Sequence, residues 1–345
     1  MSEQATAHAQ AEYPGSTTRG RACPKTASVG RHDGRSRSAA IRAYAKRTAE
    51  ALAVRTGALR LARILPPHRA LILAYHNVVP RGEFVDGEAS LHLPQESFAE
   101  QLDLLADSHE VVPLTRLLEA GASPNARRPL AAITFDDAYR GAVTAGVEEL
   151  ARRGLPATIF VAPAFVGGRS YWWDALAEGG QVGEDVRRRA IDELGGRDAA
   201  VRRWALRTGL PSCPASGYGV AASEDELAAA VRHPGVTLAS HTWSHANLTR
   251  LASEEVDDEL VHSLTWLRER FARVVPWLSY PYGRHTPEVA RRAAQAGYRA
   301  ALRTEGGGWR RPPADPYALP RLNVAAGFSR DRFVLQLAGV YRWRR

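Results

Sequence analysis

Short apolar runs alternate with amphipathic segments along most of this chain. The apolar runs predict strands at 71–78, 130–135, 157–162, 236–240, 274–279, 298–303 and 319–324. The segments between them repeat apolar residues at helical spacing and predict helices at 95–106, 115–120, 141–153, 254–272 and 286–296, with a further helix after Ser329. Strand and helix in regular turn indicate an α/β fold with a parallel sheet that is closed or nearly so.

The N-terminal part departs from this alternation. Residues 1–37 are rich in Ser, Thr, Gly, Ala and Arg without periodicity, which predicts disorder. Residues 39–65 follow a helical pattern with many arginines. This helix could lie on an anionic membrane surface, or it could pack beside the folded part with its charges in water. Its thin apolar face favours the second reading. We therefore predict a basic tail over 1–66.

A folded domain is predicted over 67–345, with one interruption. Residues 168–232 are rich in Arg and Ala and lie between two predicted strands. We interpret them as a helical insertion that caps one side of a cleft. With 345 residues and 45% hydrophobic content, the chain has ample material for one large core.

The net charge of +9 comes from the predicted tail. Residues 1–70 hold 13 Lys or Arg against four Asp or Glu, whereas the rest of the chain holds 33 of each. A nucleic-acid-binding domain carries its basic excess on its folded part, so the charge distribution argues against a nucleic-acid partner. The only cysteines, Cys23 and Cys213, do not suggest a structural disulfide and fit a reducing compartment.

The sequence suggests a location inside the cell. No stretch approaches the roughly 20 uninterrupted apolar residues of a membrane span. The first residues, Met1 to Gln4, do not begin a basic segment followed by an apolar one. We expect a cytoplasmic protein, with peripheral contact at the inner membrane face if the helix over 39–65 binds lipid.

Two adjacent carboxylates, Asp136 and Asp137, follow the strand predicted at 130–135. Two anions directly after a buried strand are costly, because both lose hydration. Successive strand residues point to opposite faces, so one carboxylate can ligate a cation while the other handles a proton. An ordinary strand-to-loop turn also accommodates Asp-Asp, and this motif alone leaves that reading open.

Two imidazoles follow the strand predicted at 236–240. His241 and His245 are four residues apart, and two imidazoles with one carboxylate form the three-ligand site of many zinc hydrolases. The alternative is a pair of surface histidines on a helix, but the strand-like segment before them argues against it. A Pro-Tyr-Gly motif closes the strand predicted at 274–279, and on its own it is only a turn.

In this order, Thr-Phe-Asp-Asp, His-x-x-x-His and Pro-Tyr-Gly resemble the polysaccharide deacetylases of carbohydrate esterase family 4. The resemblance covers roughly residues 70–325. It implies a distorted, incomplete (β/α) barrel whose active site lies at the C-terminal ends of the strands. It also implies hydrolysis of N-acetyl groups on an amino sugar of a polysaccharide or glycan precursor.

The resemblance assigns roles residue by residue. Asp137, His241 and His245 would bind a divalent cation, zinc before any other. Asp136 would be the general base that takes a proton from the metal-bound water as it attacks the acetamide carbonyl. The metal and the backbone N–H of Tyr282 would stabilise the resulting oxyanion.

The chain departs from the family pattern at two positions. Many members begin the third motif with an Arg that holds the catalytic Asp, and here that position is Ser279. Arg321, in the last predicted strand, could reach the same carboxylate or could form only a surface salt bridge. Many members also carry a late Leu-x-His whose imidazole protonates the leaving amine, and no histidine follows Val324.

His76 is the best replacement for the missing acid, because it ends the first predicted strand. A Tyr-His at this place resembles the deacetylases of the poly-N-acetylglucosamine type. His76 could be the acid, could bind substrate, or could be a satisfied core histidine. Further candidate substrate contacts are Tyr280, Trp172 and Trp173. The adjacent tryptophans could stack on a sugar ring, or they could anchor the insertion to the barrel.

Three functions remain in competition. The favoured one is a metal-dependent deacetylase of N-acetylated sugars. The second is an amide hydrolase on the same scaffold that acts on a small non-sugar amide. A long open groove beside the metal would favour the first, and a small closed pocket would favour the second. The third is a non-catalytic carbohydrate-binding protein, against which the complete set of ligands and base argues.

Overall fold

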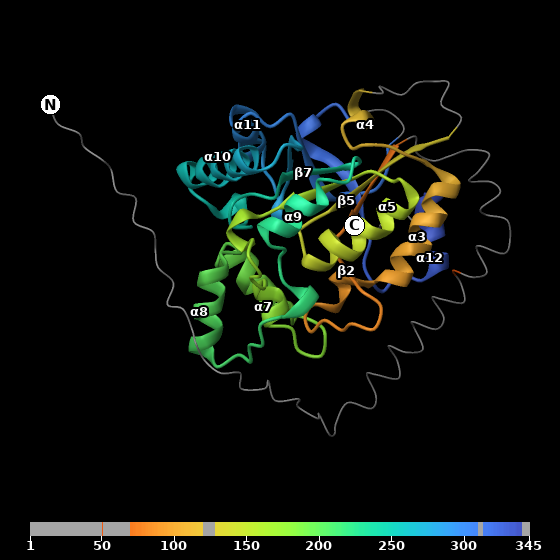
Figure 1. Ribbon diagram of the computed structural model, residues 1–345. Helices are drawn as coiled ribbons and strands as arrows, with labels where there is room; N and C mark the ends of the chain where they lie inside the picture. Colours follow the sequence, from red (N-terminus) through yellow and green to blue (C-terminus); the bar gives the residue numbers. More distant parts are fainter. Residues whose placement is uncertain (1–49, 51–69, 120–127, 310–312, 340–345) are drawn as a thin grey trace.

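Parallel strands close into a barrel (Figure 1). The structure, a computed structural model, describes residues 50, 70–119, 128–309 and 313–339. The barrel strands are β1 (Ala70–Tyr75), β5 (Leu130–Phe135), β6 (Ala157–Val161), β7 (Val236–Ser240), β8 (Val274–Ser279), β9 (Ala300–Gly306) and β10 (Leu319–Asn323). Each pairs with the next in this order, and β1 pairs with both β5 and β10, which closes the ring. The predicted α/β fold and incomplete (β/α) barrel are confirmed, with seven strands where the complete fold has about eight.

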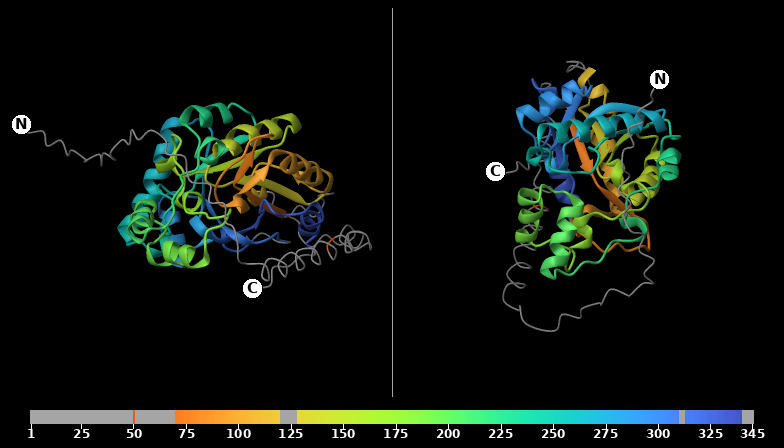
Figure 2. Two further views of the ribbon diagram at one scale, coloured as in Figure 1. Left: turned by 90° about the horizontal axis from the view of Figure 1, so that it is seen from below. Right: turned by 90° about the vertical axis from the view of Figure 1, so that its left-hand side faces the viewer.

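Helices cover the outside of the barrel (Figures 1 and 2). They lie close to the predicted bounds and are α3 (Gln95–Ser108), α4 (Arg116–Glu119), α5 (Val147–Arg153), α10 (Ser253–Arg270), α11 (Pro287–Gln295) and α12 (Arg330–Leu337). A π-helical turn over 142–146 leads into α5, which ends at Gly154 with a φ of 63°, the left-handed conformation that glycine adopts without strain. A short strand, β4 (Glu110–Val111), pairs with the start of β5.

Strand residues divide alternately between the inside and the outside of the barrel. In β1, Ile72 belongs to a hydrophobic cluster to which every barrel strand contributes, whereas Leu71 and Leu73 pack in a cluster with α3 and α5. The same alternation runs along β5 and β10. It puts Asp136 on the inner side with Ala132, and it puts Arg321 on the inner side with Leu319. The strand period thus aims a carboxylate and a guanidinium at each other across the barrel.

The prediction of one strand over residues 71–78 is partly wrong. Residues 71–78 form two strands, β1 and β2 (Asn77–Val79), that are separated at His76. The amide of Asp136 donates to the carbonyl of Tyr75 at 2.9 Å, and beyond that bond the chain leaves the barrel. β2 pairs instead with β3 (His92–Pro94). All residues of β1 and β2 are buried, so both sides of the break look like one buried strand, and the sequence does not reveal the break.

The predicted insertion is largely helical. It contains α6 (Trp172–Ala175), α7 (Glu184–Arg188), α8 (Asp198–Thr208) and α9 (Glu224–Ala230). In Figure 1, α7 and α8 lie on the side of β2, which follows the C-terminal end of β1.

The predicted tail over 1–66, including the helix over 39–65, lies outside the described residues apart from Glu50. Within the ranges that the structure describes, no helix is long and apolar enough to cross a bilayer.

Candidate active site

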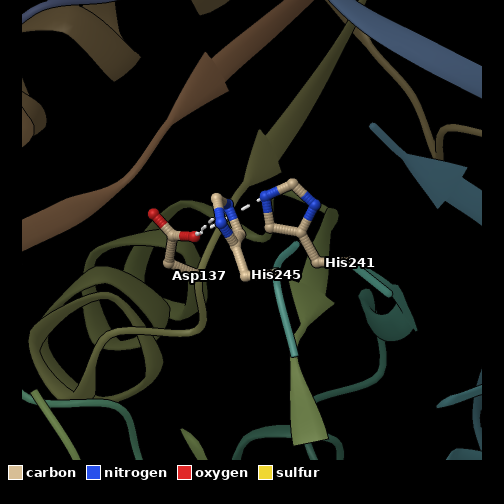
Figure 3. Close-up of side chains that lie close together, drawn as sticks. All are labelled: Asp137, His241 and His245. Carbon is tan, nitrogen blue, oxygen red and sulfur yellow. Dashed lines mark ion pairs between the residues drawn. The ribbon is translucent and has the colours of Figure 1, made fainter. Parts of the chain in front are cut away.

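Three candidate metal ligands meet at the C-terminal ends of β5 and β7. Nε2 of His245 lies 3.3 Å and Nε2 of His241 lies 3.5 Å from Oδ1 of Asp137. Figure 3 shows the carboxylate facing the two rings. One ligand atom from each residue lies within 4.8 Å of the others, and all three residues are buried. The two motifs meet because only β6 separates β5 from β7 and the carboxyl ends of parallel strands share one rim.

The geometry of these residues fits a tetrahedral cation. Ligand atoms about 2.0–2.1 Å from a tetrahedral zinc ion lie roughly 3.3 Å from one another, close to the two measured separations. Oδ1 of Asp137, the atom nearest both rings, is buried and accepts no hydrogen bond. A buried carboxylate oxygen without a donor is a costly arrangement that a cation would relieve. We infer that these residues would hold the metal.

Hydrogen bonding and burial prepare both histidines as ligands. Nδ1–H of His241 donates to the carbonyl of Ser279 at 2.7 Å, which leaves the Nε2 lone pair facing Asp137. Burial lowers the pKa of His241 despite the opposing effect of the Asp136 carboxylate. Burial and the neighbouring His241 lower the pKa of His245 well below its usual range. Both rings are therefore neutral at pH 7, as metal binding requires.

The loops that carry the site have strained backbones. Within the described residues, positive φ angles at non-glycine positions occur at Asp137, Ala138, Thr242, His245 and Tyr282. All five positions lie in the three motifs or directly after them. Such conformations cost about 1–3 kcal/mol each and persist where the surroundings enforce them, frequently at active sites. The strain accounts for the way two ligands leave their strands and turn towards a common point.

Asp136 forms a buried bidentate ion pair with Arg321. Nη1 and Nη2 of Arg321 donate to Oδ1 and Oδ2 of Asp136 at 2.8 and 2.6 Å. Ser279 contacts both partners, donating to Asp136 at 3.2 Å and accepting from Arg321 at 2.8 Å. Arg321 is fully buried, so the structure places it against the carboxylate and not in a surface salt bridge.

This ion pair keeps Asp136 ionised. Burial alone would raise the pKa of Asp136, but the attraction of Arg321 and its hydrogen bonds outweigh burial and hold the pKa well below its usual range. Nε2 of His241 lies 3.9 Å from Oδ2 of Asp136, so the ionised carboxylate adjoins the three ligands. Asp136 is thus placed to accept a proton next to a bound cation.

His76 lies in the same pocket. Burial is the main cause that lowers the pKa of His76 to about 4, while Asp136 opposes this shift and Arg321 adds to it. The ring is therefore neutral at pH 7. As the predicted acid, it would have to gain a proton during the reaction before passing one to the leaving amine. The assignment of His76 as the acid stays a prediction.

The pocket above the ligands is small. Its volume is about 220 Å³, and its lining includes exposed Ser90, so it opens to solvent. The further lining residues are His76, Leu91, Asp136, Asp137, Trp172, Trp173, Arg187, His241, His245, Tyr282, Thr304 and Asn323. A larger cavity, of about 860 Å³, is lined by residues of α8 and α10 and by Trp243. It shares no lining residue with the pocket that holds the ligands. We assign the chemistry to the smaller one because it holds the ligands.

The three candidate substrate contacts differ in position. Trp172 and Trp173 line the pocket, but both are almost fully buried, with indole N–H groups that donate to Tyr282 and Tyr139. This geometry favours the anchoring role over an exposed stacking platform. Tyr280 does not line the pocket. Its ring is buried in the cluster beneath α10 and α11 and its hydroxyl donates to the carbonyl of Tyr317, so the structure does not support a substrate contact.

Sequence reasoning missed several lining residues. Asn323 lies at the C-terminal end of β10, and its buried Oδ1 has no hydrogen-bond donor. The rule that strand ends carry sites could have found it. Arg187 reaches the pocket from α7 and donates to the buried carboxylate of Glu88 at 2.6 Å. Nothing in the Arg-rich insertion distinguishes this arginine from its neighbours before the fold is known.

The barrel carries its candidate metal ligands and an adjoining ionised carboxylate at the C-terminal ends of its strands, an arrangement typical of hydrolases. A sequence profile described as polysaccharide deacetylase matches residues 123–301, more than half of the chain. The chain therefore belongs to the polysaccharide deacetylase family. Members of this class are hydrolases that remove N-acetyl groups from sugars, and this chain is one of them.

Known relatives agree with the family. The YxkH protein of Bacillus subtilis, assigned to the polysaccharide deacetylases, is 22% identical over 269 residues, which are 77% of this chain and 75% of YxkH. The deacetylase PplD of Streptococcus pyogenes superimposes with a TM-score of 0.55 at 15% identity, over 79% of this chain and 99% of PplD. IcaB of Ammonifex degensii superimposes with a TM-score of 0.54 at 18% identity, over 79% of this chain and 96% of IcaB. At these identities the two structures show a shared fold.

Removing the metal is expected to expose a pH-dependent weakness. Burial, together with the negative charges of Asp136 and Asp174, raises the pKa of Asp137 well above its usual range. A raised folded-state pKa means that stability is complete below the unfolded value and is lost as the pH rises through the folded one. In a chelator at pH 7, wild type should therefore melt at a lower temperature than Asp137→Asn.

Thermal unfolding of both metal-free proteins across pH 4–8 tests this expectation. The difference in melting temperature should shrink as the pH falls towards about 4. With zinc added the order should reverse, because only wild type has the full ligand set. A difference that is constant with pH would contradict the raised pKa.

Proposed function

We propose that the protein hydrolyses the N-acetyl group of an amino sugar in a reaction that depends on a divalent cation, most favourably zinc. The observation that carries this proposal is the buried set of Asp137, His241 and His245 with ionised Asp136 directly beside it. A bound cation supplies Lewis acidity, which polarises the acetamide carbonyl and makes water more acidic. We favour Zn²⁺ over other divalent cations because one carboxylate and two imidazoles are ligands that zinc prefers.

The residues of this chain would move the protons. Asp136 would accept a proton from the attacking water, because Asp137 is committed to the cation. The backbone N–H of Tyr282 would donate to the oxyanion that develops on the carbonyl. The carbon–nitrogen bond then breaks and acetate leaves. The leaving amine takes up the proton that Asp136 had accepted, with His76 as the residue that would pass it on. PplD, one of the structural neighbours, was solved in complex with acetate, the product expected here.

The pocket size bears on the substrate. A volume of about 220 Å³ lies below the roughly 300–1,000 Å³ of pockets that enclose drug-sized ligands. It suits an acetamido group with part of one sugar ring, presented singly or at a chain end. A cytoplasmic location, which we also propose, would call for such a unit on a lipid-linked or nucleotide-linked precursor. The same small size favours a second candidate function, hydrolysis of a small non-sugar amide.

Acetate release separates these functions. Purified protein with quantified zinc should release acetate from N-acetylglucosamine oligomers, with about one zinc ion bound per chain. Asp136→Asn should lose activity and keep zinc, whereas His241→Ala should lose both. Full zinc occupancy without acetate from any oligomer, but with turnover of a small amide, would support the second candidate. A protein that binds no divalent cation would overturn the proposal.

A further inference from the structure

The tetrapeptide Tyr171-Trp172-Trp173-Asp174 begins the insertion, and each of its side chains reaches a different part of the site. All four residues are at most 5% exposed. They lie in or directly before α6. We call this segment the clamp. Its burial distinguishes it from the helices α7, which has no buried residue, and α8, in which only Val201 and Ala205 are buried.

Tyr171 contacts the loop of one metal ligand. Its hydroxyl donates to the backbone carbonyl of Asp137 at 2.7 Å. Its ring is stacked between Phe165 at 4.2 Å and Trp173 at 4.4 Å, measured between ring centroids. The bond fixes the peptide that follows Asp137, where φ is 67° and the backbone is strained. Tyr171 therefore helps to hold the carboxylate in its ligating orientation.

The two tryptophans contact the other two motifs. The ring of Trp173 lies 4.8 Å from the imidazole of His245. The indole N–H of Trp172 donates to the hydroxyl of Tyr282 at 3.1 Å. Tyr282 also has a positive φ, of 58°, so its backbone N–H direction depends on how the residue is held. One short segment thus touches the loops after β5, β7 and β8.

Asp174 holds the clamp in place through three buried partners, Glu88, His92 and Tyr139. Its Oδ1 accepts from the backbone N–H of Glu88 and lies 3.0 Å from Nε2 of His92. Its Oδ2 accepts from Tyr139 at 2.6 Å, and the hydroxyl of Tyr139 in turn accepts from Trp173. This buried network leaves the clamp little freedom to shift, because every polar atom of the Asp174 carboxylate has a partner.

We propose that the clamp is a positioning unit for the site: Tyr171 holds Asp137 and thereby sets the affinity for the metal, and Trp172 holds Tyr282 and thereby directs its backbone N–H. The inference rests on the cation site proposed above. It gives the insertion a role in forming the metal site itself, in addition to covering it. Outer partners of metal ligands typically change affinity or activity by about 10–100-fold when removed.

The test uses zinc alone and needs no substrate. Tyr171→Phe keeps the ring stack and removes only the hydroxyl that reaches Asp137. We expect zinc affinity, measured by competition with a chromophoric chelator, to fall about ten-fold or more. Tyr317→Phe is the matched control, since its hydroxyl donates to the backbone carbonyl of Tyr298 at 2.8 Å, away from the pocket. The control should bind zinc as wild type does.

A second variant separates the two arms of the clamp. Trp172→Phe should leave zinc affinity unchanged and lower kcat for acetate release, because Tyr282 is not a ligand. Cobalt-substituted Tyr171→Phe should also show a shifted visible spectrum, which a general loss of stability would not produce. Wild-type zinc affinity in Tyr171→Phe would overturn the proposal, as would an equal loss in Tyr317→Phe. If neither wild type nor any variant releases acetate, but Tyr171→Phe binds zinc more weakly than wild type and Tyr317→Phe does not, the proposed function is wrong and the positioning role of Tyr171 is supported.

Discussion

Replacing Arg321 by methionine is expected to destabilise the protein by about 3–5 kcal/mol and to remove most of its activity. The guanidinium is fully buried and makes two hydrogen bonds to Asp136 and one to Ser279. Its removal leaves the Asp136 carboxylate buried without a counter-charge. The variant must either bear an unpaired anion or protonate Asp136, the proposed general base, and both outcomes would impair the proposed reaction.

The pH dependence identifies the cause. In wild type the lowered pKa of Asp136 contributes stability that is present above the unfolded value, 3.8, and is lost as the pH falls through the folded one. In Arg321→Met, burial still raises the pKa of Asp136, but the positive charge that opposes it is gone, so this pKa should rise. The stability difference should therefore be largest at pH 8, should decrease towards pH 4 as the carboxyl of the variant protonates, and should disappear only below pH 4, as the wild-type carboxylate is protonated in turn. The acidic limb of kcat/KM should move to higher pH.

Urea unfolding of the metal-free proteins at several pH values measures this difference. Arg292→Met is the control, because Arg292 pairs with Asp257 and Glu288 at the surface of α10 and α11. Its loss should destabilise the protein far less than the loss of Arg321, because solvent screens ion pairs at the surface. Equal destabilisation by both substitutions, or a loss that does not change with pH, would show that Arg321 acts through packing alone.

The sequence predicted the barrel and the meeting of its motifs because both depend on local patterns. Strand residues alternate with period two, and motifs at carboxyl ends of parallel strands share one rim. Arg321 is predicted on other grounds, as a residue of the last strand that could replace the arginine missing at Ser279. Arg321 lies two residues after Leu319 in β10, so its side chain points to the same inner face of the barrel, where it meets Asp136.

The parts that sequence could not predict depend on where a buried side chain points. Tyr280 and Tyr282 lie two residues apart in one motif, yet only Tyr282 lines the pocket, since a positive φ at Tyr282 turns the chain. The break at His76 lies between two short segments that are both fully buried, so the two strands read as one. For Trp172 and Trp173, composition could not separate a platform from an anchor, because both use the same aromatic surface.

Asp136→Asn and Asp137→Asn are expected to fail in different ways, although the residues are adjacent. Asp136→Asn removes the proposed base and should lower kcat by about 10²–10⁴-fold while zinc stays bound. Asp137→Asn removes a ligand and should weaken zinc binding, so millimolar zinc should restore part of its activity. The reason is geometric, because Oδ1 of Asp137 faces both imidazoles whereas both oxygens of Asp136 are held by Arg321.

The measurement is acetate release as a function of added zinc, with bound zinc quantified at each concentration. Asp136→Asn leaves Arg321 as a buried cation facing a neutral amide, so its folded fraction must be checked by circular dichroism before rates are compared. Restoration of Asp136→Asn by zinc would assign Asp136 to the metal as a ligand and contradict the division of roles. If neither variant responds to zinc and both bind it as wild type does, Asp137 cannot be a ligand, and the cation site must be sought elsewhere in the pocket.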